Sequence, residues 1–173
     1  MVQLMAYNYY EFKIYELEGL EMMKRTESFD QEVELSLKLF VVLTRALQSI
    51  QEKTVADIKV YGLNKTEFGV LELLYHKEDQ PIQKIGQQLL LASSSITYVV
   101  DKLEGKKLVE RKACPKDRRV TYAGLTGEGI KLMDEIFPEH GKALHHILGG
   151  LDAAEKKEMI AQIKKLGLFA ESV

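Results

Sequence analysis

Several kinds of residue and segment are scarce in this chain, and each scarcity excludes a class of protein. The 173 residues include one cysteine, Cys114, and no tryptophan. A single cysteine excludes an internal disulfide and agrees with a reducing compartment. No apolar run approaches the roughly 20 residues that a membrane helix requires, and the first residues lack the basic and then apolar order of a signal peptide. We therefore expect a cytoplasmic protein without a membrane partner.

A strong positive charge is also missing. The formal net charge is −2, which excludes binding of nucleic acid through bulk charge. Basic residues are nevertheless clustered, because eight of them and three acidic residues fall between Lys102 and Arg119. The basic ones are Lys102, Lys106, Lys107, Arg111, Lys112, Lys116, Arg118 and Arg119. A charged run is often no more than a solvated surface, so its meaning depends on the segment before it.

The segment before this cluster predicts a helix with two different faces. Ile96, Val99, Val100 and Leu103 recur at helical spacing and can face a core. The side chains off this stripe are mostly short and polar: Ser94, Ser95, Thr97, Tyr98 and Lys102. They gather in the first turns, where a recognition helix presents side chains to the major groove. The pattern therefore predicts a helix that reads double-stranded DNA.

The serines at the start of this helix have two compatible interpretations. Serine is a preferred N-cap residue, so Ser93 or Ser94 is expected to cap the helix. The remaining hydroxyl groups can then bond to phosphates or base edges.

Local start and stop signals organise the rest of the chain. The first expected helix runs from Ser28, which is spaced with Gln31 as a capping box, to Tyr61-Gly62. The second begins at Asn64, with Glu67 completing a capping box, and the third begins at Pro81. After the hairpin, one helix runs from Thr126 to a kink or interruption at Pro138, and the last begins at Asp152, with Glu155 completing its capping box. After Lys107 the period changes to two on both sides of a turn at Pro115, which predicts a β-hairpin. The fold class is mainly α, with about six helices and a two-stranded hairpin.

The long first helix is apolar over more than one face. Such a helix must bury against more than its own domain. We therefore expect a homodimer whose interface uses this helix and the last two helices.

Other candidate sites are weaker. No set of nucleophile, base and orienting group is present, nor a glycine-rich phosphate loop, so we expect neither an enzyme nor a cofactor. His140, His145 and His146 do not have the spacing of a metal site on one helix face, and we expect no metal. Cys114 lies near Lys112 and Lys116, and cations lower a thiol pKa. It is a candidate redox sensor, although no second cysteine could resolve an oxidised form.

Residues 1–21 differ from the rest, because four of the eight tyrosines fall within the first fifteen positions. We interpret this segment as an N-terminal extension upstream of the true start at Met22 or Met23, since Glu18-Gly19 could be encoded by a ribosome-binding sequence. The alternative is a tail that packs on a partner subunit.

Several runs of residues resemble those of a known protein family. The run DRRVTYAGLT (117–126) resembles the wing signature of the MarR family, Asp-x-Arg followed by Leu-Thr. The runs TEFGVLELLYHKEDQP (66–81), LLLASSSITYVVDKLE (89–104) and CPKDRRVTYA (114–123) are similar to the MhqR-like branch of quinone- and catechol-responsive repressors. The resemblance implies a homodimeric winged helix-turn-helix that binds a palindromic operator and is released by a small phenolic compound or an oxidant.

The resemblance also assigns residues. It places Arg119 on the wing arginine that enters the minor groove, braced by Asp117, and it places Lys116 and Arg118 on wing positions that reach phosphates. The narrow minor groove of A·T tracts attracts a guanidinium group. Leu90 and Lys107 stand where the family usually has glycine, so we expect the helix end and the take-off of the wing to depart from the family pattern.

The resemblance also suggests where an aromatic inducer could bind. In this fold a cavity would lie where the first, second and fifth helices meet. Its candidate lining is Phe40, Leu43, Thr44, Phe68, Tyr75 and Met133.

The expected organisation is a DNA-binding domain over residues 63–126 and a helical dimerisation region over 22–62 and 127–173. We expect a dimeric repressor that binds an inverted repeat with half-sites about 10 bp apart. The alternative is a dimeric ligand- or protein-binding module that has kept this fold without DNA recognition.

Overall fold

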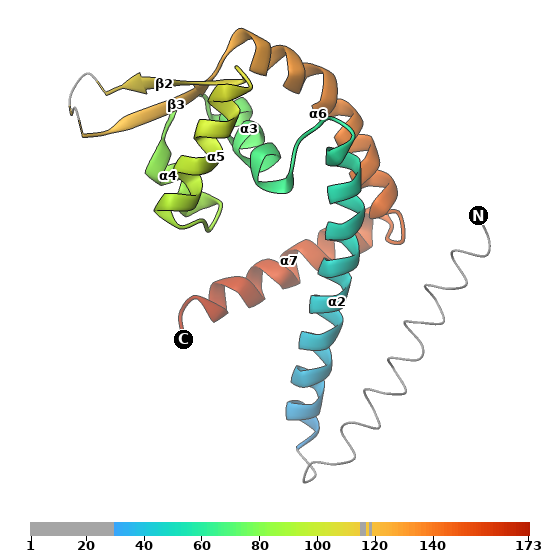
Figure 1. The fold of residues 1–173 in the computed structure, drawn as a ribbon. Coiled ribbons are helices and arrows are strands. Elements are labelled where there is room, and N and C mark those ends of the chain that lie inside the picture. Colours follow the sequence, from blue (N-terminus) through green and yellow to red (C-terminus); the bar gives the residue numbers. More distant parts are fainter. Residues whose placement is uncertain (1–29, 115–116, 118) are drawn as a thin grey trace. The chain divides into compact units, whose positions relative to one another are not determined.

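The computed structural model describes residues 30–114, 117 and 119–173. The predictions for the extension at residues 1–21 and for the cap at Ser28 lie outside these residues. With the labels of Figure 1, the elements are α2 (Gln31–Lys59), α3 (Lys65–Lys77), β1 (Gln80–Pro81), α4 (Ile82–Gln88), α5 (Ser93–Gly105), β2 (Val109–Ala113), β3 (Thr121–Leu125), α6 (Gly127–Ile147) and α7 (Ala153–Ala170). The described residues thus contain six helices, which confirms the mainly α fold class.

The chain divides into two units, Met1–Leu47 and Gln48–Val173. The described part of the first unit is the N-terminal part of α2. The second unit holds the remaining elements and the buried core, which is formed mainly by α3, α4, α5 and α6.

Most of the predicted helix starts are confirmed. Asn64 accepts from the Glu67 amide while the Glu67 carboxylate accepts from the Asn64 amide, both at 2.9 Å. Asp152 and Glu155 form the same reciprocal pair at the start of α7. The Thr126 hydroxyl accepts from the Gly129 amide at 3.0 Å. These signals involve residues close in sequence, which is why they could be recognised before folding.

One local prediction is wrong, and for a second, a kink or interruption at Pro138, the interruption is excluded while the kink stays a prediction. The N-cap of α5 is Ala92, and no side chain caps this helix, because Ser93, Ser94 and Ser95 already belong to its first turn. Helix α6 is not interrupted at Pro138 but continues to Ile147. The buried side chains of Ile136 and His140 lie on both sides of this proline, and such packing can hold a helix together where one backbone hydrogen bond is lost.

The sheet has three strands rather than two. The hairpin pairs β2 with β3 in the register Val109↔Leu125 to Ala113↔Thr121. The third strand, β1, is only two residues long and pairs with β3 through Gln80↔Ala123 and Pro81↔Tyr122. It precedes α4 directly, so Pro81 is both a strand residue and the N-cap of that helix. This pairing fixes the start of the helix-turn-helix pair on the hairpin.

The turns on both sides of α5 use left-handed residues that are not glycine. Leu90 has a φ of 55° and Lys107 a φ of 61°. After α4 the amide of Leu91 bonds to the carbonyl of Gly86, and after α5 the amide of Leu108 bonds to the carbonyl of Leu103. A hydrogen bond from an amide to the carbonyl five residues earlier, at the end of a helix, is typical of a Schellman motif. Both residues therefore adopt the left-handed conformation that favours glycine, while the expected departure in the take-off of the wing stays a prediction.

The left-handed conformation of Lys107 leads to a stability prediction. This conformation costs a non-glycine residue roughly 1–2 kcal/mol. Glycine avoids that cost, although its greater freedom in the unfolded chain offsets part of the gain. We expect Lys107→Gly to raise the free energy of unfolding by about 1 kcal/mol. Urea unfolding at neutral pH measures it.

The matched control for this change is Lys107→Ala. It removes the same charge but keeps a Cβ atom at the left-handed position, so its stability should remain near that of the wild-type protein. Equal stabilisation by both variants would show that charge, and not backbone conformation, is responsible.

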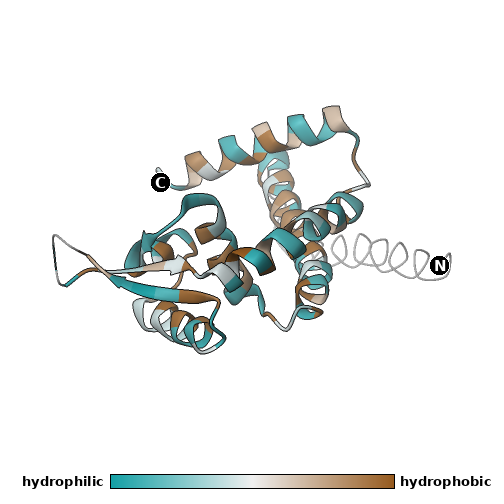
Figure 2. Cartoon of the chain, turned by 90° about the horizontal axis from the view of Figure 1, so that it is seen from above, coloured by the Kyte–Doolittle hydropathy of each residue, from teal (hydrophilic) through white to brown (hydrophobic). Residues whose placement is uncertain are grey.

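Several helices carry exposed apolar side chains. In α2 these include Leu35, Leu39 and Leu47, and α7 contains no buried residue although Ile160, Ile163 and Phe169 lie along it. Figure 2 shows apolar positions recurring along α7. Within the described residues no helix is long and apolar enough to cross a membrane.

Candidate nucleic-acid interface

Helix α5 has the two faces that the sequence predicts. Ile96, Val100 and Leu103 are fully buried, and Val99 is nearly so. The candidate DNA-binding side chains of α5 are all exposed: Ser93, Ser94, Ser95, Thr97, Tyr98 and Lys102. The buried stripe thus fixes the rotation of α5 about its axis, and the polar side chains are left accessible to another molecule.

Two contacts orient the exposed side chains of α5. The Thr97 hydroxyl donates to the carbonyl of Ser93 at 3.0 Å, so this hydroxyl is held against the helix backbone. The Lys102 ammonium lies 4.8 Å from the centre of the Tyr98 ring, and Tyr98 raises the pKa of this lysine. Lys102 is therefore charged at neutral pH and is presented beside an exposed aromatic ring.

The hairpin carries an exposed arginine near its end. Arg119 donates from Nε to Oδ1 of Asp117 at 3.1 Å and from Nη2 to Oδ2 at 3.0 Å. Its side chain is 90% exposed. Arg119 lowers the pKa of Asp117, and Asp117 raises the pKa of Arg119. The two side chains form a paired fork that holds the guanidinium in one orientation. Lys116 and Arg118, the other predicted wing contacts, lie outside the described residues.

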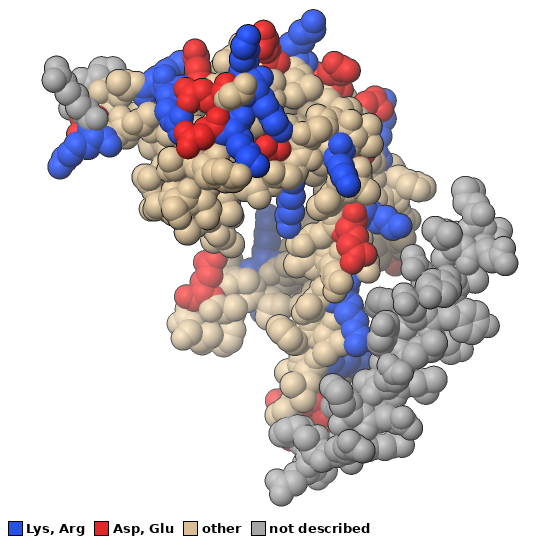
Figure 3. All heavy atoms as spheres, in the orientation of Figure 1, with Lys and Arg blue, Asp and Glu red and all other residues tan. Residues whose placement is uncertain are grey.

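Several basic residues of the cluster bond to acidic groups of the same chain. Arg111 pairs with Asp101 at 2.6 Å and with Glu104. Lys112 pairs with Asp79 at 2.9 Å and with Glu110 at 3.2 Å. Figure 3 accordingly shows basic and acidic side chains interleaved around the base of the hairpin, with basic atoms also at its far end. The base of the hairpin is less positive than the count of basic residues suggests.

Lys106 is also engaged within the chain. Its ammonium donates to the Gly62 carbonyl and to the Glu67 carboxylate, both at 3.0 Å. Gly62 has a φ of 70° and follows α2, as the sequence predicts for the end of that helix. Lys106 therefore ties the end of α5 to the turn before α3.

The role of Arg111, Lys112 and Lys106 was missed because each has an acidic partner on another element: Asp101 and Glu104 on α5, Asp79 before β1, and Glu67 on α3. One signal was present for Arg111. It is two residues after the buried Val109 on strand β2 and so faces the same side of the sheet. A charged residue on an inward face requires a partner.

The candidate redox residue, Cys114, is partly exposed. Its amide donates to the Val120 carbonyl at 3.1 Å, so it continues the pairing of the hairpin. Lys112, one of the cations expected to activate the thiol, bonds to Asp79 and Glu110. A sensing role for Cys114 remains a prediction.

The candidate pocket residues fall into both units. Phe40, Leu43 and Thr44 belong to the first unit, where Phe40 is 70% exposed. Phe68 and Met133 are buried in the core of the second unit, and Tyr75 packs against that core. The Tyr75 hydroxyl donates to Asp134 at 2.6 Å. The structure thus brings three of the six together, and a ligand pocket remains a prediction.

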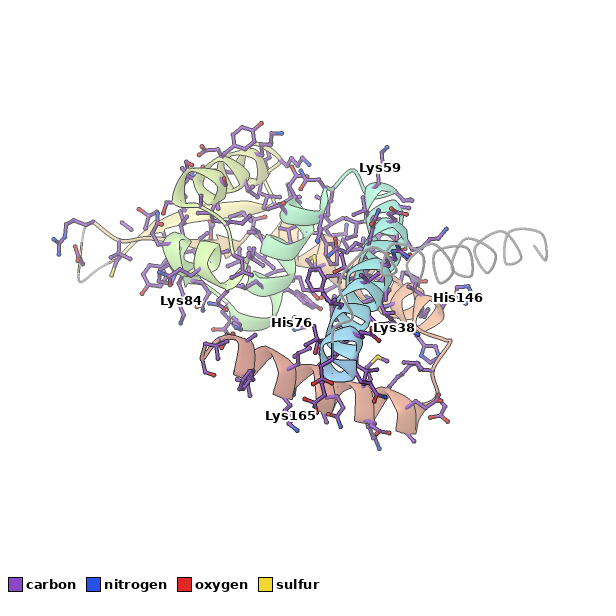
Figure 4. All side chains as sticks on the ribbon, turned by 90° about the horizontal axis from the view of Figure 1, so that it is seen from below. Lys38, Lys59, His76, Lys84, His146 and Lys165 are labelled. Carbon is purple, nitrogen blue, oxygen red and sulfur yellow. The ribbon has the colours of Figure 1, made fainter. Side chains whose placement is uncertain are left out.

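The three histidines of α6 occupy different environments. His140 is buried, lies 2.7 Å from the Asp57 carboxylate and contacts the Phe68 ring. His145 and His146 are more open to solvent, and in Figure 4 His146 points away from its helix. Among the described residues no group of histidine, cysteine and acidic side chains could hold a metal ion. His140 connects α6 to the end of α2.

Comparisons with known proteins agree with this geometry. Residues 63–121 match the MarR family. The chain is 53% identical over 138 residues to the HTH-type transcriptional regulator MhqR of Bacillus subtilis, a match that covers 80% of this chain and 95% of that protein.

Solved structures share the fold. AbsC, a MarR family transcriptional regulator from Streptomyces coelicolor, superposes with a TM-score of 0.74 at 17% identity, over 86% of this chain and all of that chain. A mutant of MarR from Escherichia coli complexed with operator DNA gives 0.70 at 20% identity, over 80% and 99% of the two chains. From its 53% identity to MhqR, together with the family match over α3 to β2, we conclude that the chain belongs to the MarR family of transcriptional regulators.

Proposed function

We propose that this protein is a homodimeric repressor that binds a palindromic operator and is released by a small phenolic or quinone-type ligand or electrophile. The observation that carries the DNA-binding part is the exposed polar face of α5 together with Arg119, whose guanidinium Asp117 holds in place on the hairpin. Helix α5 would enter the major groove and Arg119 the adjacent minor groove.

The exposed apolar side chains support a second copy as partner. Residues such as Leu35 and Phe40 on α2, and Ile163 and Phe169 on α7, would otherwise be left in water. Several exposed apolar side chains along one helix typically mark an interface. In this proposal residues 63–126 bind DNA, and residues 22–62 and 127–173 form the dimer.

The inducer class has different support. Similarity to the quinone- and catechol-responsive branch of the family, with 53% identity to MhqR, favours a small aromatic inducer. A promoter-binding assay repeated with quinones, phenols and peroxides tests this part. Release by none of these compounds would contradict the inducer class without affecting DNA binding.

Arg119→Ala tests the DNA-binding part. Loss of a specific arginine contact costs about 1–3 kcal/mol, so we expect affinity for the protein's own promoter to fall roughly 10- to 100-fold. The fold should be unaffected because the side chain is largely exposed. Fluorescence anisotropy with promoter DNA and with a scrambled sequence of equal length measures the specific loss.

The control is Lys142→Ala, which removes one positive charge from α6, where the ammonium pairs with Glu139 at 2.7 Å. Its promoter affinity should stay within a factor of about two. Equal affinity of the Arg119→Ala variant and the wild-type protein would refute the role of Arg119. Failure of the wild-type protein to prefer its promoter would favour the alternative, a binding module without DNA recognition.

A further inference from the structure

One guanidinium group joins the hairpin to helix α5. Arg111, in the middle of β2, donates from Nη2 to Oδ1 of Asp101 at 2.6 Å and from Nη1 to Glu104. Asp101 and Glu104 are three residues apart, so they project from the same side of α5. The planar fork of arginine fits two acceptors at a fixed angle, and this contact therefore constrains orientation as well as distance.

The charges around Arg111 argue against a direct contact with DNA. Its side chain is 26% exposed and faces the same side as the buried Val109. Burial acts to lower the pKa of Arg111, but the bonds and charges of Asp101 and Glu104 raise it. Two carboxylates and one guanidinium leave a local charge of −1, which repels a phosphate group.

A small rotation of the hairpin (β2 and β3), which is the wing, at the level of Arg111 would move Arg119 by a larger distance. Arg111 lies opposite Ala123 in the register of the hairpin, and Arg119 is four residues from Ala123 along the chain. Strand β3 begins at Thr121, so part of this segment is a turn, and at about 3.3 Å per residue its two ends are at most roughly 13 Å apart. A rotation of about 10° at the level of Arg111 would displace Arg119 by up to about 2 Å, more than a binding geometry tolerates.

We propose that Arg111 is a positioning residue that sets the angle of the wing on helix α5, so that Arg119 and the exposed face of α5 fit one DNA site together. This inference rests on the proposed function. Arg111 acts through Arg119 and does not bind DNA itself.

A double-mutant cycle tests the inference. Promoter affinity is measured for the wild-type protein and the Arg119→Ala variant, and again for both in an Arg111→Gln background, under conditions where circular dichroism shows each variant folded. We expect Arg119→Ala to lower promoter affinity at least about tenfold in the wild-type background and less than about threefold in the Arg111→Gln background. The second factor is smaller because, in that background, Arg119 on the misdirected hairpin no longer reaches its DNA contact.

The matched control uses the recognition helix. Ser95→Ala, placed in the same two backgrounds, should cost the same factor in both, because α5 is held by its buried stripe and not by Arg111.

A second route removes the same contact from the other side. The double change Asp101→Asn and Glu104→Gln keeps Arg111 and should reproduce the loss of coupling to Arg119. It also serves if the Arg111→Gln variant does not fold.

Three results are informative. Loss of coupling to Arg119 alone supports the inference. An Arg119→Ala penalty that is unchanged by Arg111→Gln overturns it while the proposed function stands. Absence of specific binding by the wild-type protein overturns the proposed function itself.

Discussion

Replacing Gly129 by alanine is expected to destabilise the protein by about 3 kcal/mol or more. A Cβ at this position would overlap the carbonyl oxygen of Leu108, lie 3.0 Å from its carbonyl carbon and 3.3 Å from Cδ2 of Leu125. The Leu108 oxygen cannot move away freely, because it accepts a hydrogen bond from the Thr126 amide at 3.1 Å. The change would therefore force apart the junction where α5, the hairpin and α6 meet.

Gly127→Ala is the control for this prediction. Gly127 is in the same helical turn of α6, and nothing lies within 4 Å of a Cβ built on it. Alanine there should be neutral or stabilising by up to about 1 kcal/mol. Urea unfolding of both variants and the wild-type protein measures the difference, and comparable stabilities for the two variants would refute the steric argument at Gly129.

Glu67→Ala is expected to cost about 2–3 kcal/mol, more than the net worth of one hydrogen bond. Glu67 is 4% exposed, and one of its carboxylate oxygens accepts from both the Asn64 amide and the Lys106 ammonium. Its removal leaves the Asn64 amide without an acceptor and leaves the Lys106 ammonium with the Gly62 carbonyl but without a carboxylate partner. Denaturant unfolding at neutral pH measures this cost.

The second capping box of the chain provides the control. Glu155 makes the same reciprocal contact with Asp152 at the start of α7, but it is exposed to water. Glu155→Ala should therefore cost only about 0.5–1 kcal/mol. Equal losses at the two sites would show that capping alone, without burial and Lys106, accounts for the effect.

The contribution of Glu67 should also depend on pH. Burial acts to raise its pKa, but the Asn64 amide and Lys106 together hold the pKa below its ordinary value of 4.5. Because the folded pKa is lower than the unfolded one, the stabilisation is complete above pH 4.5 and is lost as the pH falls through the folded pKa. The difference in unfolding free energy between the wild-type protein and Glu67→Gln should shrink over that range, and a constant difference would contradict the argument.

The elements that the sequence predicts well depend on nearby residues. The capping boxes at Asn64 and Asp152 and the left-handed Gly62 each involve residues a few positions apart. The buried stripe of α5 follows from helical spacing alone. Local chemistry of this kind does not require knowledge of the tertiary fold.

The failures have different physical causes. Ser93 is a preferred type of N-cap residue, but the carbonyl of Ala92 accepts the first helical hydrogen bond, from the Ile96 amide. Helix α5 therefore begins at Ser93, one residue earlier than it would with Ser93 as its N-cap. Strand β1 is too short to show a period, and only its partner β3, some forty residues later, defines it. A pairing at that distance leaves no local pattern.

The candidate DNA-binding surface was predictable in part. The exposed face of α5 and the contact between Asp117 and Arg119 were accessible from spacing and resemblance. The engagement of Arg111, Lys112 and Lys106 was not, since their acidic partners come from α5, from the loop before β1 and from α3. Counting charges along a sequence cannot distinguish a cation that faces solvent from one that is already paired.

These internal ion pairs have a consequence for how the protein finds its site on a chromosome. Arg111, Lys112 and Lys106 are already paired with acidic groups of the same chain, so these three cations add little to an attraction for DNA that is independent of base sequence. Weak non-specific attachment shortens each sliding encounter and leaves fewer copies sequestered on unrelated DNA. More copies then stay free in solution to bind a specific DNA site.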